Sequence, residues 1–166
     1  MMMRGTLIKR PGKHSMDHSV SPPPPPAPTD IVYRQATPAD VQPLLEMLAP
    51  FATARKLLRR SAAELLLLIK HGFVAELEGQ IIGFSAIEIY NRKLAEIQSL
   101  AVSEGFQGRG IGKRLVILCL ERARELDVME VLAISSSEDF LRGCGFDYSL
   151  PDQKKALFCQ LRPRDH

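Results

Sequence analysis

The chain has 166 residues, of which 45% are hydrophobic, enough for one domain with a hydrophobic core. The chain has 22 Lys and Arg against 19 Asp and Glu. Residues 1–30 hold four basic and two acidic side chains, so the rest of the chain is nearly neutral. A broad nucleic-acid interface is therefore not expected. No apolar run approaches the roughly 20 residues of a membrane helix, and the N-terminus lacks the apolar segment of a secretory signal.

Cysteines are few, and their spacing matches no metal site. Cys119, Cys144 and Cys159 are far apart in the chain and odd in number. Such a sparse set indicates reduced thiols. We therefore expect a cytoplasmic protein without a bound metal.

Residues 1–30 differ in composition from everything that follows. They contain seven of the twelve prolines, five of them in the run Pro22–Pro26. Proline runs favour an extended polyproline II conformation and build no packed core. We expect a disordered, basic, proline-rich tail followed by a single domain over 31–166. An organelle-targeting segment is the alternative, although no amphipathic helix is evident.

The first part of the domain predicts one strand and two helices. Ile31–Gln35 has the composition of a strand. Thr37 followed by Pro38 is typical of a helix start, and the apolar spacing beyond it continues to Pro50, which is expected to end that helix. The sequence Ser61–Glu64 is a capping box, which predicts a second helix running to about residue 71.

The second part predicts further strands with helices between them. The expected elements are strands at Phe73–Leu77 and Gln80–Tyr90, joined by a turn at Glu78–Gly79, a strand at Leu94–Val102, a helix at Ile111–Leu126, a strand at Glu130–Ile134, a helix at Ser137–Gly143, a strand after Gly145–Phe146 and a last strand at Ala156–Leu161. Cys119 falls on the apolar stripe of the long helix, so we expect it in the core and not as a nucleophile. The order predicts an α/β fold, a mixed sheet with helices on both faces.

A glycine-rich turn stands between the strand ending at Val102 and the helix beginning at Ile111. It reads Gln-Gly-Arg-Gly-Ile-Gly over 107–112. The first turn of a helix has unpaired N–H groups and the positive end of the helix dipole, so a phosphate fits there. Glycines let the backbone approach such a ligand, and Arg109 and Lys113 add positive charge. The pattern meets neither the dinucleotide fingerprint nor the P-loop, and a purely structural turn is the alternative.

The strand Ala95–Val102 together with this turn resembles the central motif of the GNAT N-acetyltransferase superfamily. That motif reads Gln/Arg-x-x-Gly-x-Gly/Ala, and Gln107, Gly110 and Gly112 occupy its positions. The resemblance extends over about 31–161 and implies the GNAT fold, with a twisted, mostly antiparallel sheet and a splayed strand pair. It also implies acetyl-CoA as co-substrate, with its pyrophosphate on the turn. The coenzyme contacts implied are Leu100, Ala101, Val102, Gln107, Gly108, Arg109, Gly110, Ile111, Gly112, Lys113 and Phe140.

Two further residues bear on the chemistry that the resemblance implies. Glu96 matches, by its offset in the strand, the general base of the histone-acetylating branch; an exposed or ion-paired glutamate is the alternative. Many family members have a tyrosine near the coenzyme sulfur, where this chain has Leu141. The general acid therefore stays open, and protonation of the thiolate by water is sufficient if its pKa is near ~8.5.

Within the superfamily the sequence is most similar to the acetyltransferase domain of N-acetylglutamate synthase, through residues 57–61, 72–76, 95–102 and 131–135. The similarity implies Arg60, Ser61 and Ser135 as acceptor-binding residues, because arginine binds a carboxylate bidentately. The fused kinase domain of the long synthases is missing, and the segment 135–140 is shorter than theirs.

We therefore expect acetylation of the α-amine of an amino acid such as glutamate. Acetylation of another small amine or of a protein amine, and a non-catalytic acyl-CoA-binding module, are the alternatives. No nucleic acid or membrane is expected as a partner, and a homodimer is one alternative for the oligomeric state.

Overall fold

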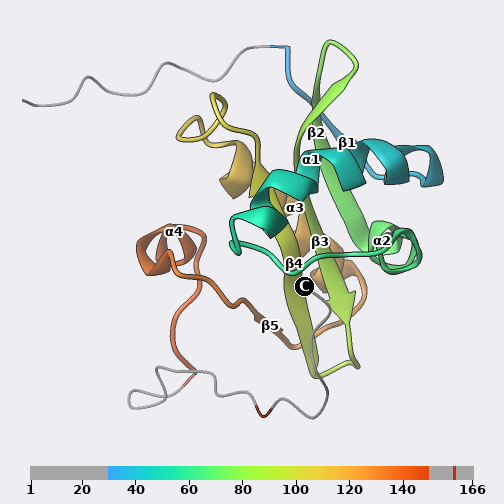
Figure 1. Cartoon of the computed structure of the whole chain (residues 1–166). Coiled ribbons are helices and arrows are strands. Elements are labelled where there is room, and N and C mark those ends of the chain that lie inside the picture. The colour runs from blue at the N-terminus through green and yellow to red at the C-terminus, as the bar shows by residue number, and fades with distance from the viewer. Residues whose placement is uncertain (1–29, 150–158, 160–166) are drawn as a thin grey trace, which may run out of the picture.

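A single five-stranded sheet organises the protein, in the order β1-β2-β3-β4-β5 (Figure 1). The computed structural model describes residues 30–149 and 159. Its strands are β1 Val32–Gln35, β2 Gly72–Leu77, β3 Gln80–Ile89, β4 Leu94–Val102 and β5 Glu130–Leu132. The first four pair antiparallel, and β5 joins β4 in parallel. This arrangement confirms the expected mixed, mostly antiparallel sheet.

Helices cover both faces of the sheet, as expected. In the view of Figure 1, α1 (Val41–Thr53) and α2 (Ala62–Leu68) lie in front of the strands and α3 (Ile111–Glu125) lies behind them. The short helix α4 (Glu138–Gly143) follows β5. Single 3₁₀ turns, Pro38–Asp40 and Ile69–His71, precede α1 and follow α2. None of the helices in the described ranges has both the length and the hydrophobicity that crossing a bilayer requires.

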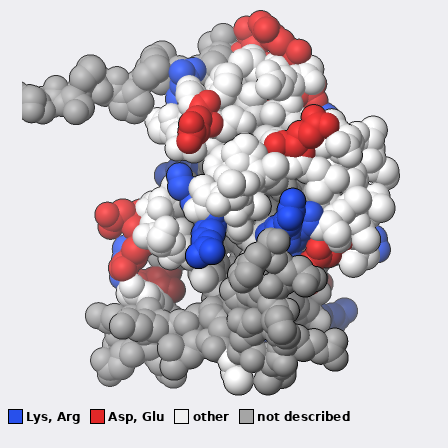
Figure 2. Space-filling model, viewed as in Figure 1, with Lys and Arg blue, Asp and Glu red and all other residues white. Residues whose placement is uncertain are grey.

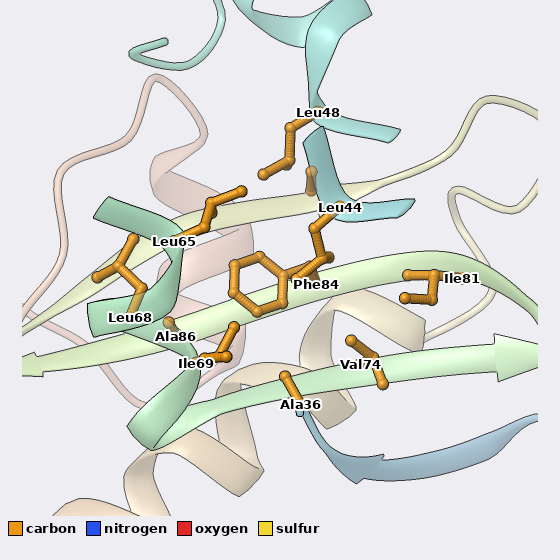
Figure 3. Packing of buried hydrophobic residues seen from close by; sticks show 11 residues of the cluster. Ala36, Leu44, Leu48, Leu65, Leu68, Ile69, Val74, Ile81, Phe84 and Ala86 are labelled. Atoms are coloured by element: carbon orange, nitrogen blue, oxygen red, sulfur yellow. The ribbon is translucent and has the colours of Figure 1, made fainter. Parts of the chain in front are cut away.

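The front core is centred on Phe84 of β3, which is fully buried (Figure 3). Leu44 and Leu48 reach it from α1, and Leu65 and Leu68 reach it from α2. Each large apolar side chain buried in this way contributes roughly 1.5–3 kcal/mol. The two short front helices are therefore held chiefly by their leucines.

The rear core lies between the sheet and α3. Ile111, Leu115 and Cys119 of α3 are fully buried there, against strands that include Ile82. Burial raises the pKa of the Cys119 thiol to about 12. The prediction that Cys119 is a core residue is confirmed.

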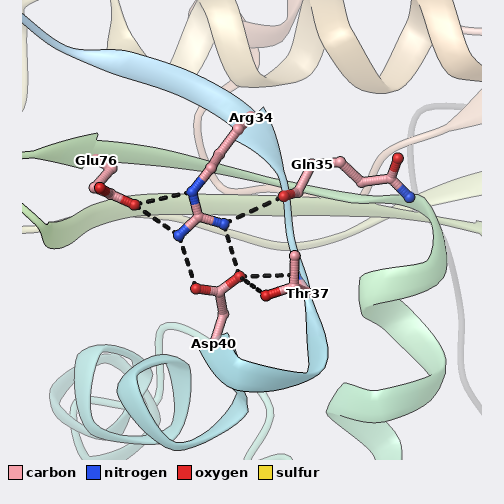
Figure 4. Close-up of polar contacts among 5 residues, drawn as sticks. All are labelled: Arg34, Gln35, Thr37, Asp40 and Glu76. Carbon is pink, nitrogen blue, oxygen red and sulfur yellow. Dashed lines mark hydrogen bonds and ion pairs between the residues drawn. The ribbon is translucent and has the colours of Figure 1, made fainter.

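A charged cluster fastens the chain before α1 to the edge of the sheet (Figure 4). Arg34 on β1 donates to both carboxylate oxygens of Asp40 at 2.8 Å and to Glu76 on β2 at 2.6 and 2.9 Å. Asp40 also accepts from the backbone N–H and the hydroxyl of Thr37. Such charge-assisted bonds are stronger than neutral ones. The Arg34 hydrogen bonds, followed by those of Thr37, lower the pKa of Asp40 to about 2 although burial opposes them.

Several predicted elements differ from those observed, most of them by a single residue at one end. Pro50 lies inside α1, which continues to Thr53. The proline removes one helical hydrogen bond, and packing of Phe51 against the front core keeps the last turn. β5 ends at Leu132 and not at Ile134, because it leaves the sheet there. Residues 146–149, where the strand after Gly145–Phe146 was expected to begin, form no strand, and the residues from 150 to 158 lie outside the described part of the chain. The strand expected at 156–161, except for residue 159, and nearly all of the tail expected at 1–30 lie outside the described residues.

Candidate active site

Strand β4 contains a bulge at Ser99 that divides it into two halves. Ser99 has a φ of 54°, in the left-handed region that non-glycine residues seldom adopt. Opposite it the register shifts, since Ala86 of β3 pairs with Gln98 while Phe84 pairs with Ala101. One extra residue on β4 is the mark of a β-bulge.

The bulge exchanges the faces to which successive β4 side chains point. Upstream of it, Ala95 and Ile97 pack into the rear core, so the side chains that alternate with them face the front helices. Downstream, Ala101 packs into the front core while Leu100 and Val102 pack into the rear one. The upstream half therefore presents polar side chains on the front, and the downstream half presents apolar ones.

Strand β5 accompanies only the upstream half of β4. Their parallel ladder covers Leu94–Glu96 and ends with Leu132, after which β5 turns away (Figure 1). The Ser103 N–H donates to β3 at 2.8 Å. Because backbone groups alternate in direction along a strand, those of Ala101 also face β3 and those of Leu100 and Val102 point into the gap. This gap is the splayed pair that was predicted, and it offers backbone hydrogen-bonding groups to a ligand.

The glycine-rich turn lies at the end of this gap. Gly108 and Gly110 have φ values of 73° and 82°, and Gly110 is the N-cap of α3. As a glycine, Gly110 has no side chain with which to cap α3, and its position leaves the first-turn N–H groups to another acceptor. The Gln107 side chain donates to the Val102 carbonyl at 2.8 Å and fastens the turn to β4. These features fit a pyrophosphate at the start of α3.

The other residues expected to contact the coenzyme differ in their exposure and in their neighbours. The Arg109 guanidinium lies 5.4 Å from the centre of the Phe106 ring, and Lys113 is exposed. Ile111 is only 1% exposed, so its side chain belongs to the core and only its backbone is available to a ligand. A Cβ on Gly112 would lie 3.5 Å from the Phe140 ring and 3.6 Å from Val102. The structure thus brings Val102, Gly112 and Phe140 together.

Glu96 lies on the front face, in the upstream half of β4, and is half-buried. It accepts a hydrogen bond from the hydroxyl of Tyr90, which follows directly after β3. Burial and then this bond raise the pKa of Tyr90 to about 12. Glu88 of β3 stands opposite Glu96 in the register. Sequence reasoning missed Tyr90 and Glu88, although two-residue alternation across the β3–β4 hairpin places both on the face of Glu96.

Arg60 reaches β4 from the connection between α1 and α2. Its Nη2 donates to Oε1 of Gln98 at 2.6 Å, and its Nη1 lies 3.6 Å from Oε1 of Glu64. Its side chain is 18% exposed, and its Nε is buried with no hydrogen-bond partner in the described part of the chain. An unpaired buried N–H costs about 1–3 kcal/mol, so a further acceptor here is favourable.

The two serines expected beside Arg60 are engaged differently. Ser61 donates to the Glu64 carboxylate at 2.8 Å and accepts from the Glu64 N–H at 3.3 Å, which is the predicted capping box. Ser135 accepts from the Ser137 N–H within its own loop. Within the ranges that the structure describes, no hydrogen bond joins Ser135 to Arg60 or Glu96. The geometry therefore groups Glu96 with Arg60 and leaves Ser135 apart.

The sheet, the gap and the glycine turn define an acyltransferase architecture. The family model "Acetyltransferase (GNAT) family" matches residues 41–146, and the chain belongs to this family; it is a GNAT N-acetyltransferase. It is 36% identical over 117 residues to an uncharacterized N-acetyltransferase of Chlorobaculum tepidum, covering 70% of this chain and 76% of that protein.

Other similar proteins act on or bind amino acids according to their names. An amino-acid acetyltransferase of Mycobacterium tuberculosis is 30% identical over 118 residues, which is 69% of this chain and 67% of that protein. The structure of N-acetylglutamate synthase from Neisseria gonorrhoeae, complexed with coenzyme A and N-acetyl-glutamate, matches with a TM-score of 0.63 and 26% identity. The match covers 68% of this chain but only 27% of that synthase.

Proposed function

We propose that the protein transfers the acetyl group of acetyl-CoA to the α-amine of an amino acid, with glutamate as the first acceptor to test. The observation that carries the proposal is the placement of a carboxylate and an arginine on the same face of β4. Glu96 is available to the amine, and Arg60, held by Gln98, is available to a carboxylate. An amino acid has both groups.

The spacing and the surrounding charge support this choice of acceptor. Glu96 and Gln98 are two residues apart on one strand, which separates them by roughly 7 Å. That is the scale of one amino acid with an acidic side chain. The connection between α1 and α2 also contains the exposed residues Arg55, Lys56 and Arg59. Basic side chains gather at the middle of this face (Figure 2), which favours an anionic acceptor.

The chemistry follows from the two halves of β4. The coenzyme would place its pyrophosphate at the start of α3 and its thioester along the gap, where backbone N–H groups of Leu100 and Val102 can stabilise the developing oxyanion. Glu96 removes a proton from the amine, directly or through water. A nitrogen–carbon bond then forms, the carbon–sulfur bond breaks, and the coenzyme leaves as a thiolate that water protonates.

The test is thiol release from acetyl-CoA with a panel of amino acids, polyamines and a histone-like peptide. Glutamate-dependent release that falls ~100-fold or more in Glu96→Gln, to a residual rate that can still be measured, supports the proposal. In Arg60→Ala the KM for the acceptor should rise ~10- to 100-fold, since a hydrogen bond to a charged group contributes about 1.5–3 kcal/mol, while the KM for acetyl-CoA stays unchanged. Arg124→Ala, an exposed arginine on the opposite face, is the matched control. An unaltered acceptor KM in Arg60→Ala would remove Arg60 from the site.

A non-catalytic acyl-CoA-binding module is the second candidate, because Leu141 stands where many relatives have a tyrosine. Coenzyme binding without turnover in both the wild type and Glu96→Gln would favour it. Release with a peptide amine alone would keep the family and change the acceptor. A cytoplasmic location belongs to the same proposal and is supported by three free cysteines, Cys119, Cys144 and Cys159.

A further inference from the structure

Tyr90 lies within the proposed acceptor site, and nothing in the chemistry above uses it. Its hydroxyl donates to Oε2 of Glu96, the carboxylate that is to accept the amine proton. Tyr90 is 48% exposed, so an apolar role in the core does not explain it. A half-exposed tyrosine whose hydroxyl donates to the proposed general base is placed to act on that base.

The contacts of Tyr90 extend beyond Glu96. A hydrogen bond with the Gln98 side chain also acts on the Tyr90 hydroxyl, in the direction that lowers its pKa. Gln98 in turn accepts from Arg60 at 2.6 Å. One continuous set of polar contacts therefore connects Glu96, Tyr90, Gln98 and Arg60, and it joins the group proposed for the amine to the group proposed for the carboxylate.

The charges around Glu96 explain why its carboxylate needs a hydrogen-bond donor to fix its orientation. Glu88 stands directly opposite on β3, and like charges in opposite positions repel. From β5, the residue in register with Glu96 is Leu132, which carries no charge. Among the residues that the structure describes, Arg60 contacts Gln98 and makes no hydrogen bond to Glu96, and Lys93 lies exposed in the β3–β4 turn. Without a donor such as Tyr90, the repulsion would turn the Glu96 carboxylate away from Glu88.

We propose that Tyr90 is a positioning residue, which holds the Glu96 carboxylate in place for the amine and, through Gln98, keeps it at a fixed separation from Arg60. The inference rests on the proposed function, because it assigns Tyr90 a task in the same acceptor site. It differs from that proposal in making the reaction depend on Tyr90, which follows directly after β3 and lies beside the start of β4, whereas the coenzyme turn follows the end of β4.

The first test measures the link between Tyr90 and Glu96 without any reaction. The chain has three tyrosines and no tryptophan, so near-ultraviolet absorbance reports phenol ionisation cleanly. Subtracting the absorbance titration of Tyr90→Phe from that of the wild type gives the ionisation curve of Tyr90 alone. The same difference in a Glu96→Gln background should have a lower midpoint, because both the hydrogen bond and the charge of Glu96 raise the pKa of Tyr90. An unchanged midpoint would overturn the inference.

The second test is kinetic. Tyr90→Phe should lower kcat/KM for the acceptor ~10-fold, as expected for one hydrogen bond to a charged group, with the KM for acetyl-CoA unchanged. The decrease should vanish in the Glu96→Gln background, since Tyr90 acts through Glu96. Tyr33→Phe, in the rear core, is the matched control and should behave as the wild type.

The outcomes separate this inference from the proposed function. Wild-type kinetics in Tyr90→Phe, or an equal decrease in both backgrounds, would refute the task assigned to Tyr90 while acetyl transfer stands. A wild type that acetylates no acceptor would refute the proposed function, and the task of Tyr90 with it. In that case a shifted Tyr90 midpoint would show that the contact itself exists.

Discussion

The ion cluster at the edge of the sheet makes a quantitative prediction about stability. Asp40→Asn keeps the shape of the side chain and its acceptor for Thr37, but removes the charge that Arg34 binds. The pKa of Asp40 falls from 3.8 to about 2 in the folded protein. At about 1.4 kcal/mol per pKa unit this corresponds to roughly 2.4 kcal/mol. Since the Arg34 side chain is 34% exposed, solvent screening reduces the expected loss to about 1–2 kcal/mol.

The sign of the effect fixes its pH dependence. A carboxyl whose pKa is lowered by folding stabilises the protein fully above its unfolded pKa, and this contribution is lost as the pH falls through the folded pKa. Asp40→Asn should therefore be less stable than the wild type in urea unfolding near neutral pH. The deficit should shrink between about pH 4 and pH 2. Glu46→Gln, which removes an exposed charge from α1, is the matched control. Equal stability of Asp40→Asn and the wild type at neutral pH, or a deficit that persists at pH 2, would refute the reasoning.

Three other features give predictions of the same kind. Gly110→Val forces a β-branched residue to a φ of 82° and should abolish coenzyme A binding in isothermal titration calorimetry. Gly112→Ala, whose Cβ would lie at an ordinary 3.5 Å from Phe140, should bind coenzyme A as the wild type does. Unchanged affinity in Gly110→Val would remove the turn from the coenzyme site. Ser99→Val should lower the free energy of unfolding by about 1–2 kcal/mol while Ser99→Gly does not, because only the former is strained at positive φ; equal urea midpoints would argue against strain at the bulge. Iodoacetamide should label the exposed Cys159 and spare the buried Cys119, as read by mass spectrometry of the native protein, and rapid labelling of Cys119 would contradict its place in the core.

Local rules predicted most of the fold. The turn at Glu78–Gly79, the capping box at Ser61 and the bounds of β4 follow from short stretches of sequence, and the structure confirms each. The failure at Pro50 has a different origin, since tertiary packing holds the last turn of α1 against the preference of one residue. The early end of β5 also depends on distant residues, because a strand stops where its partner diverges.

The site was harder to predict than the fold. A motif was sufficient to single out Glu96 and the glycine turn, because their neighbours in sequence carry the pattern. The contact between Arg60 and Gln98 joins residues 38 positions apart, and no local pattern indicates it. Tyr90 was within reach of strand alternation, but the residues of the turn between β3 and β4 had to be counted correctly to place Tyr90 on the same face as Glu96.

The bulge at Ser99 has a consequence for how this enzyme can be changed. In the proposed site it lies between the acceptor side chains and the coenzyme-facing backbone, so separate stretches of one strand would serve the two substrates. Gln98 can be exchanged for another residue without altering the backbone that begins at Leu100, so acceptor preference is open to redesign while Glu96 and coenzyme use are preserved. Deleting Ser99 would have the opposite effect. It would turn every later side chain of β4 to the wrong face and move Ala101 out of the front core. A single inserted residue thus makes one half of the strand tolerant of variation and the other half intolerant of any change in length.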